Sequence, residues 1–407
     1  MTTFEKMLEN DRKNAFIERK ETSLNTSEEE ILELKKYIFS EECDADIRRL
    51  MDGDFFFDIP VAIYLRKGHS NKRRRVYRFL PKEKMLMQYI AYVMHDYDEE
   101  LYSSSLYSFR IGRHISEIFS TISKLKCNET DWVLKGDIKG YGDHVDPVIL
   151  CEQLRALYEK DDPQILYFFE RLLLRGEFIE KGKMVHEPTG ALSGCALTNF
   201  FENIYLLDMD EMILSRATYY CRFADDIAIF MKSEDELKEL YADIQALFDK
   251  RGLTFNMKKT EIVPPGGNFE LLGFNVSGSD FDIADSSQDK IKWKLRHFAK
   301  KLVKMQRRGW ITKEEAEQRM IDRINEYFFI HKNSEHELNW VAWAFRVING
   351  ADSLRDLDEC AQSCIRYAGS GGKTTDAKYR IRYKDMKKKG YRTLVHAYYH
   401  REELRKL

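Results

Sequence analysis

The chain has 407 residues, of which 43% are hydrophobic and 33% are charged, and its formal net charge is −2. This length corresponds to about two or three domains, and the apolar content is sufficient for folded cores, so we expect a folded, soluble protein. There is no long uninterrupted apolar run, and the first six residues lack the basic-then-apolar order of a signal peptide, so we expect a cytoplasmic protein without membrane contact. The seven cysteines include no Cys-x-x-Cys pair, which argues against a zinc knuckle and favours reduced thiols.

The first part of the chain is predicted to be mainly helical. Residues 1–50 are acidic, and Ser27 and Glu30 have the spacing of a helix capping box ahead of an apolar stripe. Residues 54–79 contain short apolar segments around an arginine-rich stretch, which predicts a β-hairpin with a basic loop. Helices are expected at about 82–96 and 112–125.

The middle of the chain contains two strand-like regions that carry aspartates. Residues 132–138 are apolar and predict a central strand that ends at Asp137. Residues 219–230 form two apolar runs that meet at Asp225 and Asp226, which predicts a tight hairpin with both carboxylates at its tip. Between these regions, Asp-Pro pairs are expected to start two helices, and a long amphipathic helix is expected at about 194–215.

The remaining residues are predicted to complete a small sheet and then to form helices. Ser233 and Glu236 are expected to cap a helix that runs to Lys250, and strand-like segments follow. The order of strand, helices, hairpin, helix and strands indicates an α+β domain with a small antiparallel sheet. After a polar segment, helices are expected at about 288–308, 313–328, 335–348 and 353–367, followed by a flexible glycine-rich link at 369–372 and a basic tail.

Two adjacent aspartates at the tip of an apolar hairpin have two interpretations. They can belong to a solvated turn, because aspartate is common in turns, or they can bind a cation, because two like charges at the edge of a core are costly without one. The hairpin alone leaves both interpretations open. Asp137 would add a third carboxylate if its strand is the neighbour of the hairpin, and phosphoryl transfer uses clustered carboxylates to hold about two divalent ions roughly 3.5–4 Å apart.

Six segments resemble motifs of reverse transcriptases and occur in the order found in that family. The hairpin resembles the aromatic-x-Asp-Asp motif, and the preceding strand resembles the Asp-Ile-Lys-Gly-aromatic motif of bacterial members. The other four resemble the fingers arginines, the segment beside the incoming nucleotide, the following lysine motif and the primer grip. In chain order the segments are Arg75 to Pro81 with Arg110-Ile111-Gly112-Arg113, Gly136-Asp137-Ile138-Lys139-Gly140-Tyr141, Pro188-Thr189-Gly190 with Ser193, Gly194 and Asn199, Tyr220-Cys221-Arg222-Phe223-Ala224-Asp225-Asp226, Leu253-Thr254-Phe255-Asn256 with Lys259 and Thr260, and Glu270-Leu271-Leu272-Gly273-Phe274.

The resemblance implies a fold and a division of the chain. The fold would be a right-hand polymerase of the α+β class, with fingers, a palm that contains the small antiparallel sheet, and an α-helical thumb. We therefore expect an N-terminal helical extension at 1–50, fingers at 51–130, a palm at 131–280, a helical thumb at 281–368 and a basic appendage at 369–407.

The resemblance also implies an RNA-directed DNA polymerase that joins dNTPs to a primer 3′-hydroxyl. Asp137, Asp225 and Asp226 would be catalytic and would hold two Mg²⁺ ions, or Mn²⁺, with the backbone carbonyl of Ile138 as a further ligand. The residues expected at the nucleotide are Arg75, with Arg78 as the competing arginine, Tyr141, Gly142, Gly190, Asn199 and Lys259. The residues expected at the primer and template are Arg222, Leu272, Gly273, Lys292, Arg296 and Lys300.

Several of these residues have simpler alternatives that the sequence leaves open. The arginine run can be a solvated basic loop, Gly190 can be a turn glycine, and Asn199 can be a local cap. Lys259 and the basic helix at 290–308 can be solvated charges. Arg222 can pair with a nearby acid instead of contacting template or primer.

Gly142 is the clearest departure from the family pattern. In reverse transcriptases, the fifth residue after the first aspartate of the strand motif is usually a large aromatic that clashes with a ribose 2′-hydroxyl, and here that residue is Gly142. Tyr141 stands one place earlier and could swing into the open space. Unless it does, we expect weakened discrimination between deoxyribonucleotides and ribonucleotides.

The C-terminal tail resembles the defence-associated, unknown-group bacterial reverse transcriptases, which implies a role in antiphage defence. Its interleaved tyrosines and cations could stack bases, dock RNA or present Tyr391, Tyr398 or Tyr399 as a protein primer. The implied partners are an RNA template, including a dedicated non-coding RNA, a DNA product, dNTPs, and an oligomer or partner protein. The alternatives are a relaxed or template-independent nucleotidyltransferase and a catalytically idle RNA-binding scaffold, although the three intact aspartates argue against the scaffold.

Overall fold

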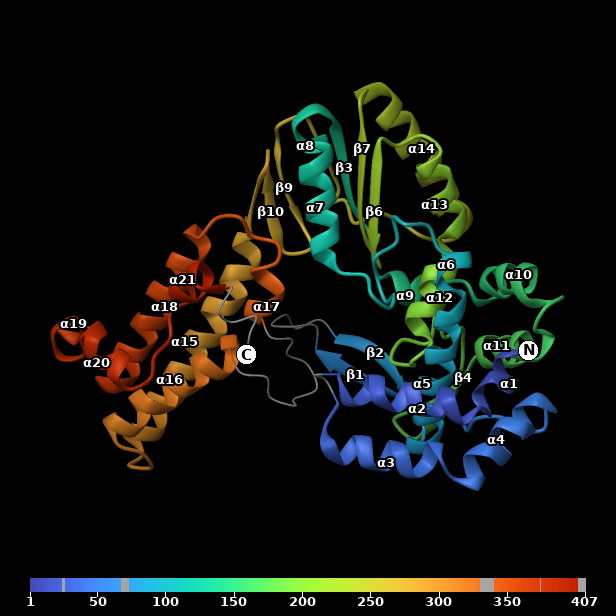
Figure 1. Cartoon of the computed structure of the whole chain (residues 1–407), viewed down its shortest axis with the longest axis horizontal. Coiled ribbons are helices and arrows are strands. Elements are labelled where there is room, and N and C mark those ends of the chain that lie inside the picture. The colour runs from blue at the N-terminus through green and yellow to red at the C-terminus, as the bar shows by residue number, and fades with distance from the viewer. Residues whose placement is uncertain (24–25, 67–72, 330–339, 374, 402–407) are drawn as a thin grey trace. The chain divides into compact units, whose positions relative to one another are not determined.

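The structure is a computed structural model that describes residues 1–23, 26–66, 73–329, 340–373 and 375–401 (Figure 1). The chain divides into two compact units, each described here by itself. The first unit contains residues 1–114 and 130–265, and the second contains residues 115–129 and 266–407. Within the described ranges, no helix is both long enough and apolar enough to cross a membrane.

The first unit begins with helices that pack around a common core. The predicted capping box is confirmed, because the Ser27 hydroxyl accepts from the Glu30 N–H at 3.2 Å and the Glu30 carboxylate accepts from the Ser27 N–H at 3.0 Å. Phe16 stacks near Tyr89, with ring centroids 5.0 Å apart, and joins the N-terminal helices to α5. The helices are α1 (Thr3–Met7), α2 (Asn10–Glu21), α3 (Glu28–Ile38), α4 (Glu41–Met51), α5 (Pro81–Met94), η1 (His95–Tyr97), α6 (Asp98–Leu101), α10 (Pro147–Tyr158) and α11 (Pro163–Leu174).

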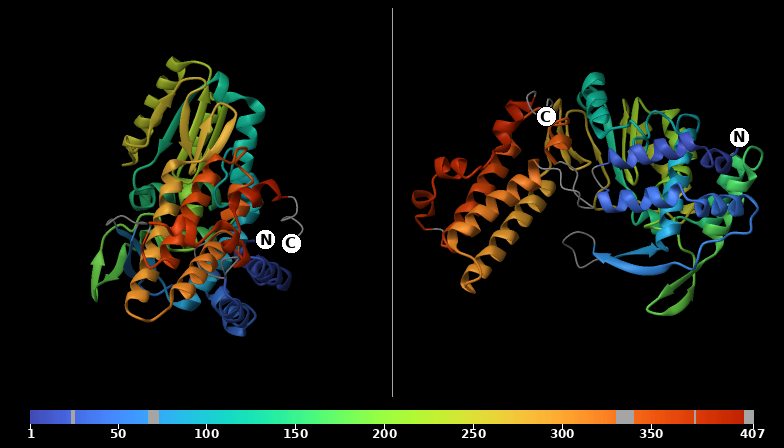
Figure 2. Two further views of the ribbon diagram at one scale, coloured as in Figure 1. Left: turned by 90° about the vertical axis from the view of Figure 1, so that its left-hand side faces the viewer. Right: turned by 60° about the horizontal axis from the view of Figure 1, so that its bottom comes forward.

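A four-stranded sheet, which we call the fingers sheet, lies next to these helices (Figure 2, right-hand view). The predicted hairpin in residues 54–79 is confirmed as β1 and β2, while its expected basic loop at 67–72 lies outside the described residues. A second hairpin, β4 and β5, was not expected from the sequence. The strands are β1 (Val61–Arg66), β2 (Arg73–Arg78), β4 (Glu177–Glu180) and β5 (Lys183–His186), in the order β2-β1-β4-β5.

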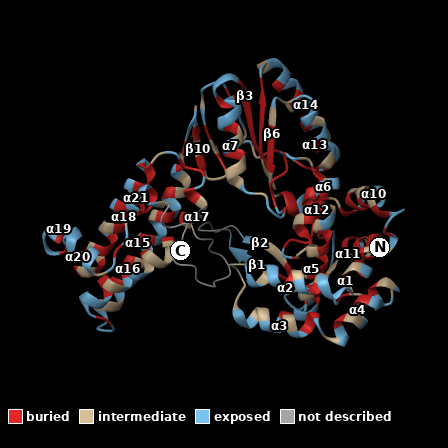
Figure 3. Ribbon diagram, in the orientation of Figure 1, coloured by how far each residue is buried: buried red, intermediate tan, exposed pale blue. Residues whose placement is uncertain are grey.

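A second four-stranded sheet, the palm sheet, has the order β6-β7-β3-β8, and its pairings are antiparallel. Its central strands are almost entirely buried, as Figure 3 shows. The helix expected at 194–215 is divided, because Leu206 leaves the helical conformation with φ −112° and ψ 13°. The elements are β3 (Trp132–Asp137), β6 (Tyr219–Phe223), β7 (Asp226–Met231), β8 (Glu261–Val263), α9 (Tyr141–His144), α12 (Thr198–Tyr205), α13 (Leu207–Leu214) and α14 (Glu234–Lys250).

The second unit combines a three-stranded antiparallel sheet with helices. Phe119 of α7 contacts Phe274 and Phe281 edge-on, with centroid distances of 5.2 and 5.4 Å, so α7 packs on this sheet. The two compact units are a coarser division than the expected fingers, palm and thumb, which remain predictions. The elements are α7 (Ile115–Leu125), α8 (Cys127–Thr130), β9 (Asn268–Leu271), β10 (Phe274–Ser277), β11 (Asp280–Ile283), α15 (Asp285–Arg307), α16 (Lys313–Phe329), α17 (Trp340–Ala344) and α18 (Asp352–Gly369). Much of the helix expected at 335–348 lies outside the described residues.

The described part of the C-terminal tail is packed against α18, which corrects the expectation of a flexible link at 369–372. Gly369 ends α18, and a Cβ at this position would lie 2.5 Å from the Ile381 side chain. Tyr391 and Tyr398 are 3% and 7% exposed, whereas Tyr399 is 64% exposed. The tail forms the short helices α19 (Ala377–Arg380), α20 (Tyr383–Lys388) and α21 (Leu394–Tyr399).

Candidate active site

The three aspartates predicted to be catalytic lie together at one end of the palm sheet. The antiparallel register of β3 and β7 places Asp137 opposite Asp226. Strands β6 and β7 form the predicted hairpin, which turns through Ala224 and Asp225. The Ile138 N–H donates to the Asp225 carbonyl at 3.0 Å and ties the end of β3 to the tip of the hairpin. The expected neighbourhood of strand and hairpin is therefore confirmed.

The turn that presents Asp225 has an unusual backbone. Ala224 has φ 55°, in the left-handed region, which costs a residue with a Cβ roughly 1–2 kcal/mol. The flanking strands are largely buried and hydrogen-bonded, so they can impose this conformation on the turn. Backbone strain of this kind is found at functional sites, where the surrounding structure fixes a side chain in place.

Cationic and amide side chains hold two of the carboxylates. Asp137 accepts hydrogen bonds from Lys259 Nζ at 2.7 Å and from Asn256 Nδ2 at 2.9 Å. Asp226 forms an ion pair with Lys135 at 3.1 Å. Burial raises the pKa of Asp225, and the nearby charges of Asp137 and Asp226 raise it further. The site is therefore crowded with negative charge that the protein only partly compensates.

Lys259 is not a freely solvated lysine. Its partial burial lowers its pKa, but the hydrogen bond to Asp137 and the charges of the three aspartates raise the pKa more, so the net shift is upward. The ammonium group stays protonated beside the carboxylates. This position excludes the simpler interpretation of Lys259 as an isolated surface charge.

The donor set of the three aspartates fits a hard divalent cation, because such ions prefer clustered carboxylate oxygens. Among the residues that the structure describes, however, no three acidic, histidine or cysteine side chains are gathered around a single point as metal ligands. Asp137 and Asp226 instead contact Lys259 and Lys135. The backbone is thus arranged for a metal site, while the side chains are engaged in ion pairs.

A polar cavity of about 240 Å³ lies beside Asp225 within the first unit. The backbone turn that follows β3 forms one wall, and α12 forms another. Asn199, which was expected near the nucleotide, is among the residues that line the cavity. The lining residues are Arg74, Phe109, Gly140, Tyr141, Gly142, Asp143, Asn199, Glu202, Ala224 and Asp225.

Gly190 packs against protein backbone, as the alternative of a turn glycine predicts, and its contact with the nucleotide remains a prediction. Its φ is +62°, and a Cβ at this position would lie 2.3 Å from the Gly142 carbonyl oxygen. The neighbouring Ala191 N–H donates to the same carbonyl at 2.9 Å. Glycine is therefore required here because two backbone segments approach each other closely.

Tyr141 cannot fill the space beside Gly142 in this structure. Its side chain is 4% exposed, and its hydroxyl donates to the backbone carbonyl of Glu202. Burial raises the pKa of Tyr141 well above its ordinary value, so the phenol remains a neutral donor. In this structure the ring is thus part of the core, which favours the open alternative at Gly142.

The arginine that reaches the cavity is Arg74, not Arg75 or Arg78. Successive side chains of a strand point to opposite faces, so Arg74 and Arg75 diverge. Arg74 donates to Ser193 Oγ at 3.0 Å and lines the cavity. Arg75 forms an ion pair with Glu187 and lies over the Phe178 ring at 4.9 Å. Arg74 is therefore the arginine of this run that lines the cavity, and a nucleotide contact of Arg75 or Arg78 remains a prediction.

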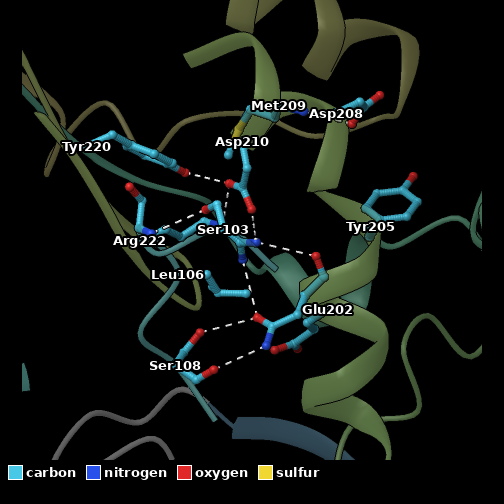
Figure 4. Close-up of polar contacts among 12 residues, drawn as sticks. Ser103, Leu106, Ser108, Glu202, Tyr205, Asp208, Met209, Asp210, Tyr220 and Arg222 are labelled. Atoms are coloured by element: carbon cyan, nitrogen blue, oxygen red, sulfur yellow. Dashed lines mark hydrogen bonds and ion pairs between the residues drawn. The ribbon is translucent and has the colours of Figure 1, made fainter. Parts of the chain in front are cut away.

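Arg222 is an internal structural residue, which corrects its expected contact with template or primer. Its side chain is fully buried and pairs with Asp210 of α13 through two hydrogen bonds of 2.8 and 2.5 Å (Figure 4). The Tyr220 hydroxyl donates to the same carboxylate at 2.6 Å. Asn203 accepts from Arg222 and donates to the Ser108 carbonyl at 3.2 Å. This network anchors β6, the strand that leads into the Asp225 turn.

The remaining expected primer and template residues belong to the second unit. Leu272 and Gly273 form the turn between β9 and β10 with φ angles of 51° and 84°, as in a tight hairpin. Lys292, Arg296 and Lys300 line a cavity of about 440 Å³ between α15 and α18. They present three cations along one helix face, and their contact with nucleic acid remains a prediction.

Sequence reasoning missed four residues of the site: Lys135, Asn256, Arg74 and Glu202. Lys135 had a usable signal, because strand periodicity places it on the same face as Asp137 two positions later. Asn256 lies within the lysine motif that was noted for Lys259. Glu202 had no local signal, because only the tertiary structure brings α12 next to Gly142.

Residues 66–276, which are 211 of the 407 residues, match the model of the reverse transcriptase (RNA-dependent DNA polymerase) family. The match contains β3, the hairpin and the cavity residues described above. The chain belongs to the reverse transcriptase family.

Individual proteins show more distant similarity. The group II intron-encoded protein LtrA of Lactococcus lactis subsp. cremoris, and the same protein of strain MG1363, are each 24% identical over 211 residues, or 51% of this chain. The matched part spans 34% of those relatives, about a third of their length.

Two solved structures from Candida tropicalis are also similar. One is apo telomerase truncated from its C-terminal domain, with a TM-score of 0.45 and 16% identity over 56% of this chain and 55% of the telomerase chain. The other is apo telomerase, with a TM-score of 0.48 and 11% identity over 81% of this chain and 59% of the telomerase chain.

Proposed function

We propose that this chain is an RNA-directed DNA polymerase that adds dNTPs to a primer 3′-hydroxyl. The observation that carries the proposal is the cross-strand pairing of Asp137 with Asp226, with Asp225 at the adjacent turn, inside a chain of the reverse transcriptase family. The primer 3′-oxygen forms a bond to the α-phosphorus, the bond from that phosphorus to the bridging oxygen breaks, and pyrophosphate leaves. The hydroxyl proton passes to water.

The aspartates would hold two Mg²⁺ or Mn²⁺ ions, together with the backbone carbonyl of Ile138. When bound, these cations supply charge stabilisation for the attacking and leaving oxygens. Lys259 and Lys135 pair with Asp137 and Asp226. The Lys259 ammonium would serve as counter-charge or proton donor toward pyrophosphate, and the Arg74 guanidinium, which lines the same cavity, offers a cation to the phosphates.

Primer extension on a defined RNA template tests the proposal. The wild-type chain should extend a DNA primer with dNTPs in Mg²⁺, whereas Asp225→Ala and Asp226→Ala should not. Asp249→Asn is a matched control, because Asp249 is an exposed carboxylate on α14 away from the strand ends. Extension that survives both active-site substitutions would overturn the site assignment. Extension without any template would instead support the template-independent nucleotidyltransferase.

We also propose that the polymerase acts in antiphage defence and copies a dedicated RNA. This rests on the resemblance of the C-terminal segment to defence-associated bacterial reverse transcriptases. Phage plating efficiency should fall by a large factor in cells that express the wild-type chain, and Asp225→Ala should restore it. Sequencing of nucleic acid that copurifies with the protein would identify the template, and equal plating with and without the chain would contradict the defence role.

A further inference from the structure

Glu202 is a buried carboxylate for which the polymerase mechanism has no use. It lies on α12 (Figure 4). The residue is 6% exposed, yet it lines the cavity beside Asp225. Its cationic neighbour is Arg74, at 4.0 Å. Among the described residues, no hydrogen bond ends on the Glu202 carboxylate, so an acceptor faces the cavity without a donor. Because the carboxylate lines the cavity, a ligand hydroxyl placed there can donate to it.

The carboxylate occupies the space that the absent side chain of residue 142 would take. A Cβ on Gly142 would lie 2.4 Å from Glu202 Oε1, 3.1 Å from Ser193 Oγ and 3.4 Å from Arg74 Nη2. The absence of a side chain at Gly142 therefore does not leave an empty gap. It leaves a polar surface formed by a carboxylate, a hydroxyl and a guanidinium.

The part of a nucleotide that would face this surface is the sugar. In the proposed reaction, the α-phosphate lies near Asp225, at one side of the cavity. The sugar is attached to this phosphate and would therefore lie next to it in the cavity. A carboxylate would repel the phosphates, but it accepts hydrogen bonds from neutral hydroxyl groups. Burial raises the pKa of Glu202 to about 7, with Arg74 opposing the shift, so a substantial ionised fraction is present in neutral solution.

We propose that Glu202 reads the sugar of the incoming nucleotide by accepting a hydrogen bond from a ribose 2′-hydroxyl, so that ribonucleoside triphosphates are substrates alongside dNTPs. This inference rests on the proposed polymerase function and names the substrate class of the same site. The carboxylate binds the hydroxyl that an aromatic side chain at residue 142 would exclude.

The first test compares kcat/KM for a dNTP, the matching ribonucleotide and the 2′-fluoro analogue, which can accept but not donate a hydrogen bond. For the wild-type chain, kcat/KM for the ribonucleotide should be within about tenfold of that for the dNTP. The kcat/KM for the 2′-fluoro analogue should be lower than that for the ribonucleotide, because the analogue cannot donate the hydrogen bond. Glu202→Ala should lower ribonucleotide use relative to dNTP use by about 10- to 100-fold, the usual worth of a hydrogen bond to a charged group. Glu202→Gln keeps one acceptor oxygen and should give an intermediate ratio.

A double-mutant cycle tests the contact with Gly142. Gly142→Ala places a methyl group against Glu202 Oε1 and should displace the carboxylate, since this oxygen is the end of a flexible side chain. The substitution should lower ribonucleotide use in the wild-type background but have little further effect in Glu202→Ala. Additive effects of the two substitutions would overturn the proposal.

A binding measurement separates this inference from the polymerase proposal. Calorimetry with ATP and dATP in Mg²⁺ should show that Glu202→Ala weakens ATP binding and leaves dATP binding unchanged. A deoxy-to-ribo ratio that is the same in wild type and Glu202→Ala, or ribonucleotide use that rises in the variant, would overturn the inference while leaving the polymerase proposal intact. If neither nucleotide is incorporated, the polymerase proposal fails, and the difference between ATP and dATP binding still decides the role of Glu202.

Discussion

The palm contains two groups of buried charges that differ in how fully their partners satisfy them. Arg222 and Asp210 are 0% and 3% exposed, and they bond to each other inside the protein. The Tyr220 hydroxyl also donates to Asp210, and Arg222 also donates to the Asn203 side-chain oxygen. At the end of the sheet, Asp137 pairs with the partly exposed Lys259 and Asp226 pairs with the buried Lys135, while Asp225 has a raised pKa because of burial and like charges. The first group stabilises the fold. The negative charge of the second group is only partly compensated by the protein, so a positively charged ligand can bind there.

The largest expected effect is loss of activity in Asp225→Asn without loss of stability. The substitution removes a charge that its neighbours disfavour, so thermal unfolding should be unchanged or shifted upward. Primer extension should fall on the order of 10³-fold or more, because a group that stabilises the transition state is lost. A large drop in unfolding temperature would show that Asp225 is structural and would remove the contrast with Asp210.

In contrast to Asp225→Asn, Asp210→Asn should lower the stability of the protein. It leaves the buried Arg222 guanidinium without its counter-charge, which should cost about 3–5 kcal/mol in the free energy of unfolding measured by urea denaturation. Replacing both partners together, with Arg222→Met and Asp210→Leu, should cost less than the single change. An Asp210→Asn protein as stable as wild type would contradict the assignment of this pair as the anchor of β6.

Glu202→Gln should stabilise the protein in a pH-dependent way. Because the pKa of Glu202 is raised from 4.5 to about 7, the folded state holds a proton that the unfolded state releases, so stability falls as pH rises between these values. The variant should therefore be more stable than wild type by about 3 kcal/mol above pH 7, on the scale of about 1.4 kcal/mol per pKa unit. Urea unfolding should show this gain largely vanishing near pH 4.5, with Glu152→Gln, a substitution of an exposed glutamate, as the control.

The smallest expected effect is at the strained turn. Ala224→Gly should raise the free energy of unfolding by about 1 kcal/mol, because glycine accepts φ 55° without strain. Primer extension should slow several-fold, since the turn holds Asp225 less firmly. Lys181→Gly is the matched control, because Lys181 has φ 50° in the turn between β4 and β5, and it should change stability alone.

The sequence predicted the carboxylate site well because its signals are local. Apolar runs that end in aspartates specify a strand and a hairpin, and capping boxes mark helix starts such as Ser27. The positions of Arg74 and Glu202 could not be predicted in the same way. A run of consecutive arginines does not determine which strand face meets the site, and Gly142 and Glu202 meet only through tertiary packing. Likewise, Tyr141 looked available for the site until its burial and hydrogen bond were seen.

The packing of the tail also affects how the chain can be shortened. The glycine-rich segment at 369–372 looks like a natural place for truncation, but Asp358 of α18 accepts hydrogen bonds from the Tyr391 hydroxyl at 3.2 Å and from the Leu394 and Val395 N–H groups at 2.9 and 3.0 Å. Removal of the tail would strip a buried carboxylate of these donors and uncover the apolar side of α18. Truncation at this segment would therefore damage the helical unit. Of the three tyrosines proposed as primers, Tyr391 and Tyr398 are buried and Tyr399 is exposed.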